Sequence, residues 1–310
     1  MLFETANLLI IAGSSQASNG ESKIAKPSVT VIIPTYNWST VLPFSIGSVL
    51  RQTFTDFELL VVGDGCTDDS QAVVESIQDE RVRWINLQSN SGHQSQPNNE
   101  GLKQARGELI AYLGHDDLWL PHHLKCLTAA IADGSDLAYG VIGTVNLYGS
   151  SMGLLPFRLK YERGSWVPPT GVVHRREITE KIGGWRNYRE LTVDPEVELW
   201  QRAYDANYGI TLVPRLSAIK FPAAYRRDAY KTRPSVEQAH WTQRIINEPD
   251  FEAAALMNIL LPILEEKSLL QFFSQTCKRV LGRLWSSAAN FRPKEKGEMI
   301  DEFRKFKGLG

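Results

Sequence analysis

The chain has 310 residues, with 34 Lys and Arg against 35 Asp and Glu, so its formal net charge at pH 7 is −1. This balance argues against nucleic acid as a partner, because nucleic-acid-binding domains carry an excess of basic residues. The length suits one domain of about two hundred residues with an appendage. The three cysteines show no metal-ligand spacing, which predicts reduced thiols and a cytoplasmic protein.

We expect residues 1–26 to form a flexible N-terminal lead-in, because residues 14–26 are mostly small and polar. The apolar run at 8–12 is too short to cross a membrane. No basic segment precedes it, so we expect no signal peptide.

Residues 28–87 alternate between short β-branched runs and segments of helical character. Strands are expected at 29–33, 57–62 and 82–87, and helices at 41–54 and about 70–77. Pro34 is expected to end the first strand, because proline cannot donate into a sheet ladder. Strand, helix, strand, helix, strand predicts a right-handed parallel arrangement.

Polar side chains follow the expected strands. Tyr36 lies just after the first strand, Asp64 after the second, and an apolar run ends in Asp116 and Asp117. Because open α/β sheets bind ligands at the carboxyl ends of their strands, we expect these residues at one edge. Two carboxylates there suit a hard divalent cation that bridges to phosphate oxygens. An Asp-Asp turn or a helix N-cap is the alternative interpretation.

Several segments in order resemble the family 2 inverting glycosyltransferases of GT-A fold. The segments are 31–37, 61–68, 113–117, the Asn-x-Gly segment at 99–102 with its lead-in at 105–112, and the acceptor-side segments 181–185 and 196–202. The resemblance covers roughly Ser28 to Phe221. It implies an α/β, Rossmann-like fold with a mostly parallel central sheet and flanking helices.

The resemblance also sets the expected domain boundaries. The GT-A domain is expected at 27–222, divided into a nucleotide-binding part at 27–121 and an acceptor part at 122–222. Residues 223–310 would form a basic loop and a C-terminal helical extension, with one helical stretch at 235–264. The basic amphipathic stretch at 268–285 favours a helix packed on the domain or on another subunit. It leaves open a peripheral contact with the inner face of a membrane, and a homodimer.

The resemblance implies a nucleotide-diphosphate sugar as donor, with a UDP-sugar favoured, and a hydroxyl acceptor such as a glycan or a lipid-linked glycan. It places nucleotide contacts at Pro34, Thr35, Tyr36, Asn37, Asp64, Asn99 and Asp116. An aromatic ring such as Tyr36 can form a wall for the base. Asp64 could accept a base N–H, or it could serve an Asx-turn.

For the cofactor, the resemblance implies Mn²⁺ or Mg²⁺ held by Asp117, with Asp116 contacting the ribose or supporting the metal. The chain departs from the family at Gly114, where many relatives carry an acid. This departure predicts weak metal binding without substrate, because Mg²⁺ usually relies on substrate phosphates. His115 is expected to point outward from the loop.

An inverting transfer needs a general base to take the acceptor proton. Asp194, Glu196 and Glu198 lie within five residues of one another. Aligning the family motif on the following Leu-Trp pair puts Glu196 in the base position, with Asp194 as the runner-up. Without the family, Asp194 reads as a helix N-cap and Glu196 as an acid placed near the helix dipole.

Two other functions fit parts of the pattern. A nucleotidyltransferase would need a glycine-rich phosphate loop with a basic residue after the first strand, and residues 34–37 provide neither. A non-catalytic sugar-nucleotide-binding protein stays open because of Gly114. The pattern names neither the sugar nor the acceptor, since acceptor loops carry no transferable code.

Overall fold

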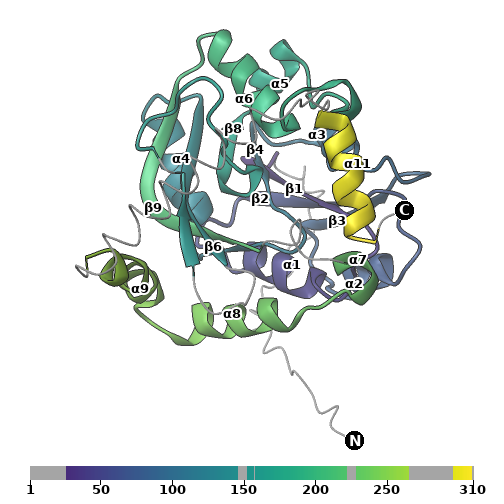
Figure 1. The fold of residues 1–310 in the computed structure, drawn as a ribbon, viewed down its shortest axis with the longest axis horizontal. Coiled ribbons are helices and arrows are strands. Elements are labelled where there is room, and N and C mark those ends of the chain that lie inside the picture. The colour runs from purple at the N-terminus through teal and green to yellow at the C-terminus, as the bar shows by residue number, and fades with distance from the viewer. Residues whose placement is uncertain (1–25, 146–151, 157, 222–227, 265–295, 309–310) are drawn as a thin grey trace, which may run out of the picture.

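The computed structural model describes residues 26–145, 152–156, 158–221, 228–264 and 296–308. Within these residues nine strands form one sheet in the order β3-β2-β1-β4-β8-β6-β9-β5, with β7 paired to β6. Helices lie on both faces of the sheet (Figure 1). The expected α/β class is therefore confirmed.

The first part of the chain builds the parallel half of the sheet. Its elements are β1 (Val29–Thr35), α1 (Leu42–Leu50), β2 (Phe57–Gly63), α2 (Ser70–Glu75), β3 (Val82–Asn86), α3 (Ser95–Gln104) and β4 (Leu109–Tyr112). Strands β3, β2, β1 and β4 are all parallel neighbours. Val31 and Ile33 pack on one face of the sheet and Ile32 on the other. Burial on both faces explains why these strands read as continuous apolar runs.

Two expected boundaries in this half are wrong. Strand β1 continues through Pro34 to Thr35. The carbonyl of Ile32 faces β4, so Pro34, two residues on, faces the same side, where the pairing with β4 has already ended. A missing N–H therefore costs no ladder bond at Pro34. Helix α1 ends at Leu50, earlier than the expected end at 54.

The second part of the chain adds a mixed half-sheet. Its elements are β5 (Leu118–Trp119), α4 (His123–Ala132), β6 (Leu137–Val145), β7 (Met152–Leu155), the 3₁₀ turn η1 (Pro169–Gly171), β8 (Val172–Arg175), α5 (Arg176–Ile182), the 3₁₀ turn η2 (Tyr188–Glu190), α6 (Pro195–Asp205) and β9 (Ile210–Lys220). Strand β8 joins β4 in antiparallel pairing, and β6 pairs with β9 in parallel. The last residue of β9 thereby comes close to the edge that carries the acid pair.

The C-terminal part is helical, as expected, but its first long helix is divided. Its elements are α7 (Ala229–Thr232), α8 (Val236–Asn247), α9 (Phe251–Leu264) and α11 (Lys296–Phe306). The expectation of one helix over 235–264 is wrong because Pro249 cannot continue a helix. Glu248, just before the proline, takes the extended backbone that this position favours, with φ −96° and ψ 104°.

Two sequence-based expectations fall outside the described residues. These are the lead-in, of which only Lys26 is described, and the amphipathic stretch at 268–285. Within the described part of the chain, none of the helices is both long enough and apolar enough to cross a membrane.

Candidate active site

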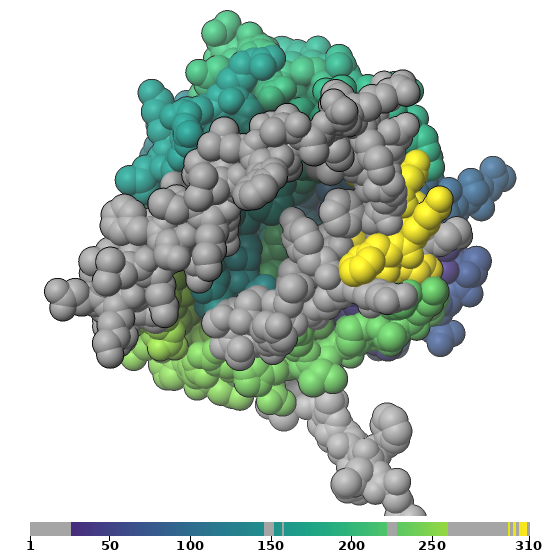
Figure 2. Space-filling view, in the orientation of Figure 1, coloured from purple at the N-terminus to yellow at the C-terminus, as the bar shows by residue number. Residues whose placement is uncertain are grey.

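The expected edge forms where β1, β2 and β4 end. Thr35 lies beside Gly63 in the parallel register, and Ile32 lies beside Tyr112. The loops after these strands therefore emerge together, which brings Tyr36, Asp64 and the acid pair to one side of the sheet, as predicted. Figure 2 shows teal residues from the middle of the chain near the centre of the view.

Asn37 shapes the edge. Its backbone has a positive φ of 42°, a conformation that asparagine tolerates better than most residues. Its side-chain Oδ1 accepts hydrogen bonds from the backbone N–H of Thr67 at 2.7 Å and of Asp68 at 3.2 Å. The amide thus ties the tip of β1 to the loop after β2, and its role in this structure is to hold two loops together.

Asp64 is buried and its carboxylate serves the loop that follows β3. Oδ1 accepts from the Ser91 N–H at 2.9 Å, while Oδ2 accepts from the Gly92 N–H at 3.2 Å and from Asn90 Nδ2 at 3.1 Å. The Asx-turn alternative is wrong, because the Cys66 N–H that such a turn would use donates to Asn86 Oδ1 at 2.9 Å, and Asp64 instead holds a loop distant in sequence. A further lone pair would have to serve any base N–H.

His115 lies inside the protein, and the expectation that it points outward is wrong. Its Nδ1 lies 2.9 Å from the Thr35 hydroxyl and its Nε2 lies 3.2 Å from the Tyr230 hydroxyl. The imidazole also packs edge-on against Trp38, with ring centroids 5.4 Å apart. Burial, the largest cause, lowers its pKa to about 4, so the ring is neutral near pH 7.

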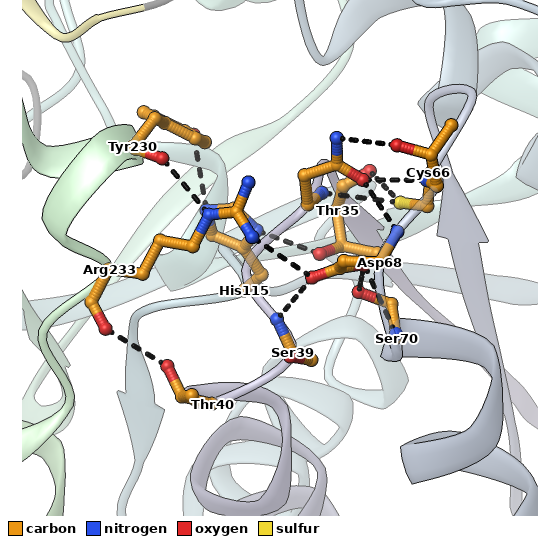
Figure 3. Close-up of polar contacts among 11 residues, drawn as sticks. Thr35, Ser39, Thr40, Cys66, Asp68, Ser70, His115, Tyr230 and Arg233 are labelled. Atoms are coloured by element: carbon orange, nitrogen blue, oxygen red, sulfur yellow. Dashed lines mark hydrogen bonds and ion pairs between the residues drawn. The ribbon is translucent and has the colours of Figure 1, made fainter.

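The segment 228–233, which follows β9 and includes α7, contacts the residues around the tip of β1 (Figure 3). Tyr230 of α7 reaches His115 and lies 6.4 Å from the ring of Tyr36. The Arg233 guanidinium lies 3.9 Å from Asp68, and its carbonyl accepts from the Thr40 hydroxyl at 3.1 Å. Tyr230 thus lies near the half-buried Tyr36 ring, which the sequence predicted as the wall for a base.

Asp117 is fully buried and its oxygens are already engaged. The Thr170 hydroxyl donates to Oδ2, and Lys220 Nζ lies 3.3 Å from the same oxygen. The Phe221 N–H donates to Oδ1 at 3.0 Å. Burial, the largest cause, raises the pKa of Asp117, and the Lys220 ammonium opposes that shift. Asp117 therefore acts here as an anchor for the end of β9.

Asp116 is the other member of the pair, and 7% of it is exposed. Its carbonyl accepts from Gln238 Nε2 at 3.1 Å, which fixes the backbone of the loop. Burial alone would lower the pKa of Lys220, but the carboxylates of Asp117 and Asp116 outweigh it and that pKa is raised. The negative charge of Asp116 thus acts, with that of Asp117, on the Lys220 ammonium.

The absent acid at Gly114 has a steric explanation in this structure. A Cβ at Gly114 would lie 2.7 Å from Asp117 Oδ2, closer than side-chain contacts allow. The Gly114 N–H donates to the Thr170 hydroxyl at 3.1 Å, so this backbone is itself part of the anchor around Asp117. The space of the missing side chain is occupied by the Asp117 carboxylate.

Lys220 is a site residue that the sequence interpretation did not identify. It is the last residue of β9 and its charge acts on Asp117, on Asp116 and on Glu196. A lysine that ends a mostly apolar strand before Phe221 was the available signal. Its importance became visible only when the topology placed the end of β9 beside the acid pair.

Glu196 lies in the first turn of α6, where only 9% of it is exposed. Its Oε1 accepts a hydrogen bond from the indole Nε1 of Trp166 at 2.9 Å. Burial, the largest cause, raises the pKa of Glu196, and the nearby Asp194 adds to the shift. A buried carboxyl with a raised pKa and one positioned donor suits proton transfer near neutral pH.

The two neighbouring acids have other surroundings. Asp194 occupies the N-cap position of α6, but its side chain makes no capping hydrogen bond, so only the position of the expected cap is right. Glu198 accepts from Arg202 Nε at 2.7 Å. Arg202 in turn donates to the carbonyls of the 182–184 loop, which makes Glu198 and Arg202 a structural brace.

Asn99 also acts as a brace in this structure. Its Nδ2 donates to the Trp185 carbonyl and its Oδ1 accepts from the Trp185 N–H, both at 2.8 Å. The amide thus joins α3 to the acceptor side of the domain. Both ends of the side chain are engaged away from the strand edge that carries Tyr36 and Asp116.

A parallel half-sheet with an acid-bearing edge, extended by a mixed half that supplies a buried carboxyl, is the arrangement of a GT-A glycosyltransferase. The sequence profile described as Glycosyl transferase family 2 matches residues 30–189, just over half of the chain, so the chain belongs to this family. Solved structures of the same fold include Staphylococcus aureus TarS 1–349 with UDP-GlcNAc, at a TM-score of 0.53 and 22% identity over 71% of each chain. The Pyrobaculum calidifontis mannosyltransferase PcManGT with GDP-Man and Mn²⁺ has a TM-score of 0.51 and 18% identity over 92% of this chain and 84% of that one.

Curated relatives match part of the chain. An uncharacterized glycosyltransferase of Nostoc sp. is 33% identical over 50% of this chain and 52% of its own length. A Campylobacter jejuni GalNAc(5)-diNAcBac-PP-undecaprenol beta-1,3-glucosyltransferase is 34% identical over 37% of this chain and 38% of its own. The Escherichia coli UDP-Glc:alpha-D-GlcNAc-diphosphoundecaprenol beta-1,3-glucosyltransferase WfgD is 31% identical over 38% of this chain and 47% of its own. The chain thus spans about half the length of these relatives or less.

Proposed function

We propose that the protein is an inverting glycosyltransferase that moves a sugar from a nucleotide-diphosphate sugar to a hydroxyl acceptor. The observation that carries this proposal is the position of Lys220, whose Nζ lies 3.3 Å from Asp117 Oδ2 at the donor edge. The charges of both Asp116 and Glu196 act on this lysine, so the donor edge and the buried carboxyl are within electrostatic reach of the same cation. A donor phosphate and an acceptor hydroxyl bound on the two sides would meet there.

A uridine nucleotide is the favoured donor. Tyr36 offers a ring for stacking, and the Asp64 carboxylate lies at the adjacent loop. Two comparisons support this choice, since one TarS structure contains UDP-GlcNAc and the E. coli relative is named for UDP-Glc. The GDP-Man complex of PcManGT makes a guanine nucleotide the alternative to test.

A divalent cation fits this site only if the donor supplies most of its ligands. In the part of the chain that the structure describes, no three His, Cys, Asp or Glu side chains cluster as a metal site. Asp117 is engaged by Thr170, Lys220 and Phe221, so we assign the cation to Asp116, with the diphosphate oxygens completing the shell. Mn²⁺ or Mg²⁺ bound there would neutralise charge on the departing diphosphate.

In the proposed step Glu196 takes the proton from the acceptor hydroxyl. The acceptor oxygen then forms a bond to the anomeric carbon from the face opposite the diphosphate. The bond between that carbon and the diphosphate oxygen breaks, and its electron pair leaves with the nucleotide. Lys220 stabilises the negative charge that grows on the leaving group, because a fixed cation in a partly desolvated site acts strongly.

The acceptor is proposed to be a glycan hydroxyl, with a lipid-linked glycan favoured. The names of the C. jejuni and E. coli relatives, which contain undecaprenol diphosphate, support this class. A lipid-linked acceptor would bring the protein to a membrane surface. The stretch 268–285, for which the sequence favours packing on the domain or on another subunit and leaves a membrane contact open, lies outside the described residues.

A thermal-shift screen with UDP, GDP, dTDP and ADP, each with and without Mn²⁺, tests the donor proposal. A ligand that binds only the folded state raises the unfolding midpoint. UDP should raise the midpoint most, and by more with Mn²⁺. Equal shifts with UDP and ADP would remove the base-reading role of Asp64, and no shift with any nucleotide would overturn the proposed function.

A non-catalytic sugar-nucleotide-binding protein is the second candidate, favoured by the closed space at Gly114. The two functions predict the same binding but different turnover. Release of UDP from any UDP-sugar that bound in the screen would exclude the non-catalytic function.

A further inference from the structure

Helix α11 lies against the candidate site although it follows the matched family region by more than one hundred residues. Figure 1 shows it as the yellow helix that runs from near α3 toward α7. Asp301 accepts from the Tyr188 hydroxyl at 2.8 Å and pairs with Arg189 at 3.6 Å. A Cβ at Gly297 would lie 2.6 Å from the Arg189 Cα, so the helix approaches η2 closely.

Arg304 extends from α11 to the loop that surrounds the Asp64 carboxylate. Its Nη2 donates to Asn90 Oδ1 at 3.2 Å, and its Nη1 donates to the Gly92 carbonyl. The same two residues donate to Asp64 from their other polar groups. Arg304 therefore holds, through their acceptor groups, the same two loop residues whose donor groups fix Asp64.

The backbone at the end of α11 is hydrogen-bonded to the segment that carries Tyr230. The Phe306 carbonyl accepts from the Asp228 N–H at 2.8 Å, and the Lys307 carbonyl accepts from the Tyr230 N–H at 3.1 Å. Tyr230 continues to His115 at the tip of β1. This connection fixes the end of α11 relative to the strand edge.

Lys307 then lies within electrostatic reach of Asp116 and Lys220. Burial, the largest cause, lowers the pKa of Lys307, and Asp116 opposes that shift. The charges of Lys307 and Lys220 therefore both act at Asp116, on the edge where the donor diphosphate would lie. An ammonium held in such a place gains most when an anion arrives.

We propose that residues 296–308 complete the donor site, with Arg304 positioning the base-side loop and Lys307 binding the diphosphate of a nucleoside diphosphate. This inference rests on the proposed function. In the opposite arrangement α11 blocks the donor through the same contacts. Variants that weaken those contacts would then bind UDP more tightly instead of more weakly.

The test uses the full chain and three variants, Lys307→Gln, Arg304→Gln and Lys305→Gln. Lys305 is exposed on the same helix, so its variant removes one positive charge without touching the site. Affinities for UDP and for uridine are measured by calorimetry, with uridine in competition against UDP. Unfolding midpoints, measured by circular dichroism, show that each variant is folded.

Lys307→Gln should weaken UDP about tenfold, the size of one charge-assisted hydrogen bond, and leave uridine unchanged. Lys307→Arg should restore most of the UDP affinity. Arg304→Gln should weaken UDP and uridine equally, because it loosens the base-side loop, and Lys305→Gln should change neither. If the wild type binds UDP, and both Lys307→Gln and Arg304→Gln bind it as tightly as the wild type or more tightly, this inference is overturned and the proposed function is not. Absence of nucleotide binding by the wild type would overturn the proposed function and this inference with it.

Discussion

The indole N–H of Trp166 donates a hydrogen bond to Glu196 Oε1 at 2.9 Å, across 30 residues of chain. Burial raises the pKa of this carboxyl, with a further contribution from Asp194, and the Trp166 hydrogen bond acts in the opposite direction. Trp166 therefore stabilises the ionised form that a general base needs. The same bond fixes where the carboxylate points.

Replacing Trp166 with Phe tests this relationship through the pH profile of kcat/KM. The base acts when deprotonated, so activity rises as the pH passes the folded pKa of Glu196. That pKa is already raised, and loss of the indole donor raises it further. The rising limb should therefore move to higher pH in Trp166→Phe, and the double variant with Glu196→Gln should show no such limb. A limb at unchanged or lower pH would refute the role of Trp166.

Replacing Glu196 with Gln should lower turnover by about two to four orders of magnitude, because the proton acceptor is lost. UDP affinity should hardly change, since the proposed role of Glu196 is toward the acceptor. Asp194→Asn is the matched control and should retain most activity, because its side chain makes no capping bond to α6 and Glu196 keeps its bond from Trp166. If Asp194→Asn is inactive while Glu196→Gln is active, the two roles are exchanged. Until an acceptor is known, release of UDP by hydrolysis is the weaker assay.

The two adjacent acids should respond differently to the same change. Asp116→Asn should remove most of the gain in UDP affinity that Mn²⁺ gives, with little effect on folding. Asp117→Asn should instead lower the free energy of unfolding by about 1–3 kcal/mol, because it leaves the partly exposed Lys220 ammonium without its charged partner. Calorimetry with and without Mn²⁺, together with urea unfolding, separates the two outcomes. The reverse pattern would return the cation to Asp117.

Stability should fall in mild acid because of buried histidines. Burial, the first cause in each case, lowers the pKa of His93 and His123 to about 3 and of His115 and His174 to about 4. These rings stay neutral in the folded protein, while the unfolded chain takes up protons below its ordinary value of about 6.5. The contribution of these neutral rings to the free energy of unfolding is complete above pH 6.5 and is lost progressively as the pH falls toward 4.

Urea unfolding at pH 7, 6 and 5 measures this loss directly. His174 is fully buried, so His174→Phe removes one titrating group and should flatten the dependence on pH. Its absolute stability also reports the lost bond between His174 and the Tyr112 hydroxyl, which is why the slope is compared rather than the value. A stability that stays level or rises toward pH 5 would contradict this assignment.

The strand edge could be predicted from the sequence because it follows from short-range patterns. Runs such as 59–62 are apolar throughout, and their alternation with helices predicts a parallel topology. That topology brought Tyr36, Asp64 and Asp116 to one edge without any knowledge of their contacts. Glu196 was likewise predicted at the start of a helix, where the structure buries it.

The direction of each polar side chain could not be predicted in the same way. Asn37 and Asn99 use their amides on loops, and His115 points inward, because their partners come from distant parts of the chain. Lys220 meets Asp117 across 103 residues, and Arg304 meets Gly92 across 212. Such contacts depend on packing between elements, which local periodicity does not encode.

Proton NMR of the full chain with UDP-GlcNAc and Mn²⁺ tests the central claim most directly. The α-linked donor should be consumed, UDP should appear, and the first free sugar released to water should be the β-anomer, because the attack comes from the face opposite the diphosphate. The same spectra should be recorded with UDP-glucose, since the sugar is not fixed by the site. Initial release of the α-anomer would contradict the inverting mechanism. If UDP is released from neither donor, neither of these two nucleotide sugars is the donor, and a non-catalytic role is favoured.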